Sequence, residues 1–330
     1  MTSLLGEKKT IVVNDDMPPQ LIVVIDAEEE FDWQAQPDRA QTNVTSMYSI
    51  ELAQTICEEY GIKPCYVVDY PVASQPEGYG LLKSYYQNGK CEIGAHLHPW
   101  VNPPFDEHLT RNNMYPGNLS IAQEKQKLEM LCDAIELAFG FKPTIYKAGR
   151  YGLGSNTVRV LESLGFEIDL SMCPPVDYRA DGGPDYSQSS AHPFLFGSNS
   201  QILEIPISGA FVGWAGAASR GVYNVGQNLI SLKLPGVLAR IKAVDRLMLS
   251  PEGFTTAEHI RLTEFLYKEG VRTFTWNLHS PSLVPGMTPY VNSKADLNDF
   301  LDLFRRYFDY FFEKLSGQAT TPNQLRARFG

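Results

Sequence analysis

The feature that most restricts the fold of this 330-residue chain is the regular alternation of short apolar segments with helix-like segments. Seven apolar or β-branched segments are predicted as strands, and nearly every one is followed by the apolar spacing of a helix. The predicted strands are residues 20–25, 63–68, 92–95, 144–147, 166–170, 202–207 and 271–277. Because strands that alternate with helices pair in parallel, the pattern predicts one α/β domain, built as a barrel or as a doubly wound sheet.

The helices are predicted between and after these strands, and the remaining long segments are predicted as loops. The helices are residues 46–59, 78–87, 120–139, 156–164, 227–244, 255–269 and 293–315. Residues 101–118 and 173–200 are the long loops. No change in composition marks a second domain, so residues 1–330 are interpreted as one domain with an N-terminal extension (1–19) and a flexible tail (317–330).

Composition excludes several classes of partner. The formal net charge is −10 and no run of Lys or Arg forms a basic stripe, which argues against nucleic acid and anionic membranes. The five cysteines are scattered without CxxC spacing, as is typical of a reducing compartment. No segment has the apolar core of a signal peptide or the length of a membrane span. These features predict a cytoplasmic protein.

Reactive side chains follow the ends of four predicted strands. They are Asp26, His96, His98, Arg150 and His279. In parallel barrels the carboxyl ends of all strands meet at one rim, and that rim holds the active site. Alone, Arg150 could be a surface ion-pair partner and His279 a buried structural histidine. Their shared position at strand ends favours a common site.

The residue types at this rim indicate metal-assisted hydrolysis. If the backbone stays extended, His96 and His98 point to the same side, and with a carboxylate they supply the ligands of a divalent metal such as zinc. A metal would polarise a carbonyl, a carboxylate could accept a proton from water, and a histidine could protonate the leaving group. Arg150 could orient the carboxylate base. This set of groups is suited to hydrolysing an amide or ester.

Four motifs resemble those of a known family. They are VIDAEEEFDW (24–33), EIGAHLHPW (92–100), KAGRYG (147–152) and LHSPSL (278–283). Over residues 21–290 the chain resembles the polysaccharide deacetylases of carbohydrate esterase family 4, which share the NodB-homology fold, and it looks closest to their WalW-like branch. The resemblance implies that the fold is a distorted (β/α)7 barrel.

The resemblance also implies roles for the residues at the rim. Asp26 takes the position of the base, Arg150 that of the arginine that holds the base, and His279 that of the acid for the leaving group. Candidates for the aspartate that pairs with the arginine are Asp177, Asp181 and Asp185. Candidates for substrate contact are Trp100, Tyr151, Ser282 and Tyr290.

By the same resemblance the metal ligands are Glu28, His96 and His98, with Glu29 or Glu30 as alternatives for the carboxylate. The chain departs from the family at both ligand motifs. Its histidines are two residues apart rather than four, and the usual adjacent aspartates are replaced by Asp-Ala-Glu-Glu-Glu. The identity of the metal, and whether one is needed, therefore stay open.

We expect a metal-dependent hydrolase that removes an acyl group, in particular acetyl, from an amino sugar or glycan precursor. One alternative is a metal-free or metal-optional amidohydrolase that acts on a small carbon–nitrogen substrate. Another is a carbohydrate-binding pseudoenzyme, although the presence of Asp26, Arg150 and His279 together argues against it. The expected partner is a carbohydrate or another small molecule, and the sequence does not indicate an oligomeric state.

Overall fold

The structure is a computed structural model that describes residues 5, 8–11, 13–14, 16–32, 35–198, 201–213 and 245–329. The helix predicted at residues 227–244 lies outside these residues. None of the helices that are described is both long enough and apolar enough to cross a membrane.

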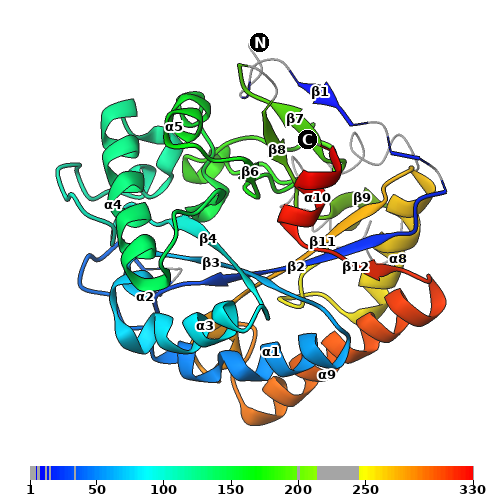
Figure 1. Cartoon of the computed structure of the whole chain (residues 1–330). Helices are drawn as coiled ribbons and strands as arrows, with labels where there is room; N and C mark the ends of the chain where they lie inside the picture. Colours follow the sequence, from blue (N-terminus) through cyan, green and yellow to red (C-terminus); the bar gives the residue numbers. More distant parts are fainter. Residues whose placement is uncertain are drawn as a thin grey trace, which may run out of the picture.

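Parallel strands form the centre of the molecule (Figure 1). In spatial order they are β8 (Ile202–Glu204), β6 (Ile168–Asp169), β5 (Ile145–Ala148), β4 (Glu92–Leu97), β3 (Cys65–Val68), β2 (Gln20–Ala27) and β11 (Thr273–His279). Each corresponds to one of the seven predicted strands. The first strand in sequence, β2, pairs with the last of the seven, β11, and this register places His279 beside Asp26.

The two ends of this row of strands are joined by hydrogen bonds just beyond β8. The amide of Thr275 in β11 donates to Ser208 Oγ at 2.9 Å. Leu249 bridges the same gap, because its amide donates to the Ser208 carbonyl at 2.8 Å and its carbonyl accepts from Asn277 at 3.1 Å. Beside this junction β9 (Gly209–Val212) pairs antiparallel with β10 (Asp245–Met248). The strands therefore form the distorted (β/α)7 barrel that the motifs imply.

The alternation of side chains along the strands divides the core into two layers. Ile22 and Val24 belong to a small cluster inside the barrel, whereas Leu21 and Val23 belong to a larger cluster between the strands and the helices. Side chains of a strand point alternately to its two faces. Asp26 continues the series of Ile22 and Val24, so its carboxylate projects inside the barrel at the carboxyl end of β2.

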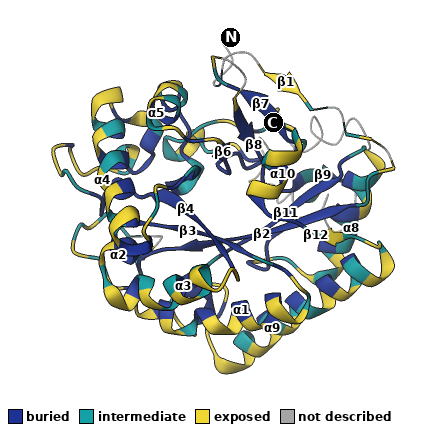
Figure 2. Cartoon of the chain, in the orientation of Figure 1, coloured by how far each residue is buried: buried dark blue, intermediate teal, exposed yellow. Residues whose placement is uncertain are grey.

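Helices cover the outside of the barrel and turn their exposed faces outward (Figure 2). They are α1 (Ile50–Glu59), α2 (Tyr70–Ser74), α3 (Pro76–Gln87), α4 (Ile121–Phe139), α5 (Thr157–Leu164), α8 (Thr256–Lys268) and α9 (Lys294–Asp309). Capping boxes begin three of them, at Ser120, Thr255 and Ser293. Trp276 of β11 stacks on Tyr307 of α9 with ring centroids 4.6 Å apart. Such aromatic pairs contribute about 0.5–1.5 kcal/mol each beyond their burial.

The C-terminal segment is ordered against the barrel, so the predicted flexible tail is wrong. β12 (Gln318–Ala319) pairs in parallel with β2, and α10 (Pro322–Phe329) follows it. Leu325 is fully buried and belongs to the cluster inside the barrel. The helix closes the end at which β4 begins, where the Asn323 amide reaches the Glu92 carboxylate. A single anchoring leucine in a short polar segment gave little sequence signal.

The predicted loop at residues 173–200 also contains regular structure. β7 (Phe194–Phe196) lies within it and pairs antiparallel with β8, while β1 (Lys9–Thr10) pairs with the other edge of β7. Part of the predicted N-terminal extension therefore joins the sheet.

Candidate active site

A cavity of about 550 Å³ opens at the carboxyl ends of the parallel strands. Eight predicted site residues line it: Asp26, Glu28, His96, His98, Arg150, Tyr151, His279 and Tyr290. The other two predicted residues, Trp100 and Ser282, are buried and do not line it. The barrel thus gathers most of the predicted site, although some of the residues have different neighbours from those predicted.

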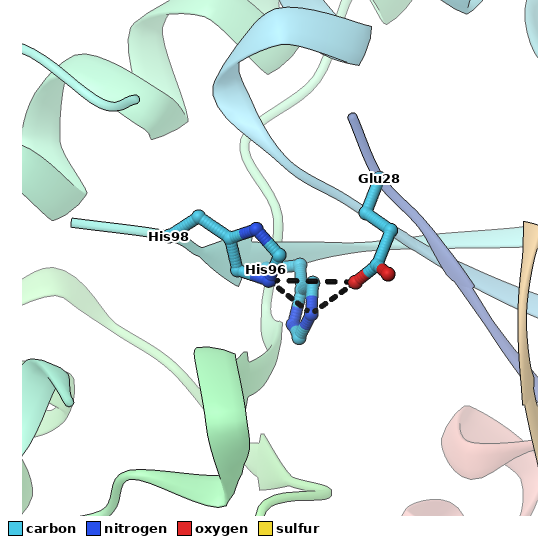
Figure 3. Close-up of side chains that lie close together, drawn as sticks. All are labelled: Glu28, His96 and His98. Carbon is cyan, nitrogen blue, oxygen red and sulfur yellow. Dashed lines mark hydrogen bonds and ion pairs between the residues drawn. The ribbon is translucent and has the colours of Figure 1, made fainter. Parts of the chain in front are cut away.

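His96, His98 and Glu28 point toward one another at the rim (Figure 3). The Nε2 atoms of the two histidines are 3.0 Å apart, and Glu28 Oε2 lies 3.6 Å from that of His96 and 3.5 Å from that of His98. Gly149 makes room for this cluster, because a Cβ at this position would lie 2.6 Å from His98 Cδ2. The prediction that the two histidines share a side is confirmed.

The neighbours of the Nδ1 atoms favour one tautomer of each ring. His96 Nδ1 lies 3.1 Å from the carbonyl oxygen of Lys147, which can only accept, so Nδ1 carries the proton. His98 Nδ1 lies 2.7 Å from Glu29 Oε2 and donates to it when Glu29 is ionised; burial raises the pKa of Glu29 to about 8. With Nδ1 protonated in both rings, each Nε2 carries a lone pair that is directed at the other ring.

This donor set fits a divalent cation. The two Nε2 atoms are 3.0 Å apart, and their lone pairs repel one another unless a cation or a proton lies between them. Glu28 Oε1 is buried without a hydrogen-bond partner, which leaves it available as a ligand. Two imidazole nitrogens and a carboxylate are a common set of ligands in catalytic zinc sites, and hydrogen bonds from Nδ1 to a carboxylate or carbonyl typically orient such ligands.

Burial also favours the metal-binding form of the histidines. It lowers the pKa of His96 and lowers that of His98 to about 4, so both imidazoles are neutral at physiological pH. Burial raises the pKa of Glu28, and a bound cation would reverse this effect by stabilising its carboxylate.

A second set of buried groups holds His98 from behind. Asp69 caps α2 by accepting from the Val72 amide at 2.8 Å, and it accepts from the Glu29 amide at 2.7 Å. Trp100 stacks on His98 with centroids 4.3 Å apart and is only 1% exposed. The prediction that Trp100 contacts substrate is therefore wrong; the ring fixes the orientation of His98.

Lys147, rather than the predicted Arg150, binds the carboxylate of Asp26, the predicted base. Its Nζ lies 2.7 and 2.6 Å from the two carboxylate oxygens of Asp26 and 3.0 Å from Asn277 Oδ1, and Asn277 Nδ2 donates to Asp26 Oδ1 at 3.0 Å. Ile145 points inside the barrel, and alternation along β5 places Lys147 there too. Burial would raise the pKa of Asp26, but Lys147 and His96 outweigh it and hold this pKa well below its usual range.

Arg150 lines the cavity but contacts a different acid. It forms an ion pair with Asp181, which identifies the partner among the three predicted aspartates. The guanidinium also lies over the ring of Tyr115. Arg150 and Tyr151 have φ angles of 53° and 59°, a left-handed conformation that costs about 1–3 kcal/mol for residues other than glycine. This turn carries the Arg150 side chain away from Asp26.

His279 is held by a residue that the sequence analysis missed, Glu252. The carboxylate of Glu252 lies 2.7 Å from His279 Nδ1 and accepts from the His279 amide at 3.1 Å. Burial opposes a charge on the ring, but Glu252, Glu28 and Asp26 outweigh it and raise the pKa of His279 to about 10. Its Nε2 lies 3.5 Å from Asp26 Oδ2.

Glu252 lies four residues beyond β10, in a segment with no strand or helix pattern, so nothing in the sequence marked it. Ser282 donates to Glu252 Oε1 at 2.5 Å. The predicted contact of Ser282 with substrate is therefore replaced by a role in fixing Glu252. Tyr290 and Tyr151 do line the cavity, as expected of substrate-contacting residues.

Comparison with known proteins establishes the fold. No protein-family model matches the sequence, and no curated protein does so. Among solved structures the chain is similar to a candidate polysaccharide deacetylase from Mycobacterium smegmatis, with 15% identity and a TM-score of 0.57 over 98% of this chain and 94% of that chain.

The chain is also similar to a 4-α-glucanotransferase from Thermococcus litoralis, with 15% identity and a TM-score of 0.53. That match covers 95% of this chain but only 41% of the glucanotransferase. At these identities the likeness defines only the class of fold, a β/α barrel. Both of the similar proteins carry the names of carbohydrate-active enzymes. The reaction has to be argued from the site.

Proposed function

We propose that the chain is a hydrolase of the family 4 carbohydrate esterase type, in its WalW-like branch, and that it removes an N-acetyl group from an amino sugar or glycan precursor. The observation that carries the proposal is the pair Asp26 and His279, which lie 3.5 Å apart at the rim beside the Glu28–His96–His98 cluster. Similarity to the M. smegmatis protein, a candidate polysaccharide deacetylase, supports the substrate class.

Glu28, His96 and His98 would hold a divalent ion, zinc being the ion that this ligand set favours. When bound there, the ion would polarise the acyl carbonyl and lower the pKa of a water molecule.

Asp26 acts as the base. Lys147 and Asn277 fix its carboxylate and keep it ionised, so it can accept a proton from water as the water oxygen bonds to the acyl carbon. Because the pKa of Asp26 is held low, the residue is a weak base, and its contribution depends on its fixed position and its negative charge as well as on its proton affinity.

His279 acts as the acid. Glu252 holds Nδ1, which leaves the protonated Nε2 directed into the cavity. As the carbon–nitrogen bond breaks, Nε2 gives its proton to the departing amine, and the products are the free amine and a carboxylic acid. The proton on Asp26 can then return to His279 across the 3.5 Å between them.

The test is release of acetate from N-acetylglucosamine and its oligomers by purified protein, with Asp26→Asn as the inactive control. Absence of acetate with every N-acetyl amino sugar, or full activity in Asp26→Asn, would overturn the proposal. Unchanged activity after exhaustive chelation would favour a metal-free amidohydrolase. Sugar binding without turnover would favour a pseudoenzyme.

A further inference from the structure

One arginine in the active-site cavity, Arg246, forms no ion pair with any residue that the structure describes. Arg246 of β10 lines the same cavity as Asp26 and His279, and its side chain is exposed. In the described part of the chain no carboxylate lies within ion-pair distance of Arg246. The carboxylate next to it in sequence, Asp245, already forms an ion pair with Arg261. As far as the described residues go, Arg246 therefore presents an unneutralised guanidinium to the cavity.

A second positive charge lies in the wall that carries Arg150. Asp181 accepts from both Arg150 and Arg111, the latter at 3.1 Å, so one carboxylate faces two guanidinium groups. This cluster keeps a net charge of about +1, because a single carboxylate can neutralise only one of the two cations. The cavity wall near Arg150 and Arg246 thus carries positive charge that the described carboxylates do not pair.

At the reacting end of the cavity the charges are paired, because Asp26 binds Lys147 and Glu252 binds His279. Asp26, Glu28 and Glu252 line it together with the histidines. An anionic group of the substrate would therefore be attracted to Arg246, whose guanidinium no carboxylate of the described residues neutralises. A substrate with one negative group would consequently bind in a single orientation, with that group at Arg246.

The rest of the lining suits a sugar ring. Tyr151 and Tyr178 stack with centroids 5.6 Å apart, and Phe254 and Tyr290 also line the cavity. Aromatic rings provide apolar contact area with a polar edge, which matches the alternating apolar and hydroxyl surfaces of a sugar.

We propose that the substrate is an N-acyl amino sugar that carries an anionic group, a carboxylate or a phosphate, and that Arg246 binds this group. The proposal rests on the proposed function and adds a specificity determinant to it. Guanidinium is well suited to the task, because its planar fork can donate two parallel hydrogen bonds to a carboxylate or a phosphate.

The test compares Arg246→Gln with Arg159→Gln, which removes the same charge from an exposed site on α5 outside the cavity. The three probes are N-acetylglucosamine, which is neutral, N-acetylmuramic acid, which adds a carboxylate, and N-acetylglucosamine 6-phosphate. Wild-type protein should prefer one of the two charged sugars, and the preferred one identifies the anion. Arg246→Gln should lower kcat/KM for that sugar by about 10–100-fold, mainly through KM.

Activity on the neutral sugar should fall much less than activity on the charged sugar in Arg246→Gln, and it should change by less than about twofold in Arg159→Gln; circular dichroism shows that both variants are folded. Arg246→Lys should recover part of the loss, because lysine restores the positive charge but not the two parallel hydrogen bonds of a guanidinium group. Equal use of neutral and charged sugars by wild type, or an equal effect of Arg159→Gln, would overturn the inference and leave the proposed function intact.

Equilibrium binding of the same probes separates the two proposals. If wild-type protein hydrolyses none of the sugars, the proposed function fails, but tighter binding of a charged sugar that is lost in Arg246→Gln would still support the anion site. If the charged and neutral sugars bind equally, the anion site fails as well.

Discussion

Replacement of Lys147 by Met should reveal how much the site depends on the buried Lys147–Asp26 ion pair. Methionine has nearly the same length and keeps the apolar contacts, but it removes the ammonium group that binds both oxygens of Asp26. Both side chains are almost completely buried. Removing one partner of a buried ion pair typically costs about 3–5 kcal/mol, because the other charge is left without compensation. We expect a loss of this size in the free energy of unfolding, measured with urea at pH 7.

The size of the loss should depend on pH. In the wild type the pKa of Asp26 lies below its unfolded value of about 3.9, so ionisation stabilises the fold above that value and the contribution is lost as the pH falls through the folded pKa. Without Lys147, burial is less opposed and the folded pKa of Asp26 moves upward. The stability difference between wild type and variant should therefore grow as the pH rises from about 4 to 7. The acid limb of the pH–activity profile of Lys147→Met should move to higher pH.

A double variant provides the matched control. Lys147→Met combined with Asp26→Asn removes both charges, and replacing a buried pair as a whole is often nearly neutral for stability. The double variant should recover most of the lost stability but no activity. An unfolding free energy for Lys147→Met within about 1 kcal/mol of wild type at pH 7, with an unshifted acid limb, would refute the assignment of Lys147 as the residue that holds Asp26, the proposed base.

Three further predictions concern the acid and the closed end of the barrel. His279→Ala should lower turnover by about 10²–10⁴-fold while the bound metal, measured by elemental analysis, stays unchanged; loss of metal would make His279 a ligand. Glu252→Gln removes the carboxylate that raises the pKa of His279 to about 10, so the alkaline limb of the pH–activity profile should move to lower pH, and an unmoved limb would contradict the role of Glu252. Leu325→Ala should lower the unfolding free energy by about 2–5 kcal/mol without changing KM, and a stability equal to wild type would show that α10 does not close the core.

The strands of the barrel could be predicted because burial on both faces leaves a strong pattern. Residues of β2 pack either inside the barrel or beneath the helices, so the segment is apolar almost throughout. Asp26 interrupts that pattern where the strand meets the cavity, and His96, Arg150 and His279 follow strands in the same way. Their presence at one rim was therefore predictable, as was the convergence of the two histidines.

The partners within the site could not be predicted, because they depend on where each strand ends. The KAGRYG motif contains two cations, and only the end of β5 at Ala148 decides that Lys147 points inside while Arg150 turns away. Glu252 and Arg246 come from a part of the chain that joins the site through tertiary packing alone. Nothing in their local sequence distinguishes them from surface residues.

The pairing of β2 with β11 has a consequence for how the protein acquires activity. Asn277 and Asp26, which hydrogen-bond to one another, are 251 residues apart in the sequence. Contacts between such distant segments form slowly, because a long loop must close before they yield any stability. The proposed base, Asp26, and the proposed acid, His279, therefore meet only when the first and last strands of the barrel come together. Recovery of catalysis during refolding reports this closure, and it should lag behind the return of helical signal, which needs only local contacts.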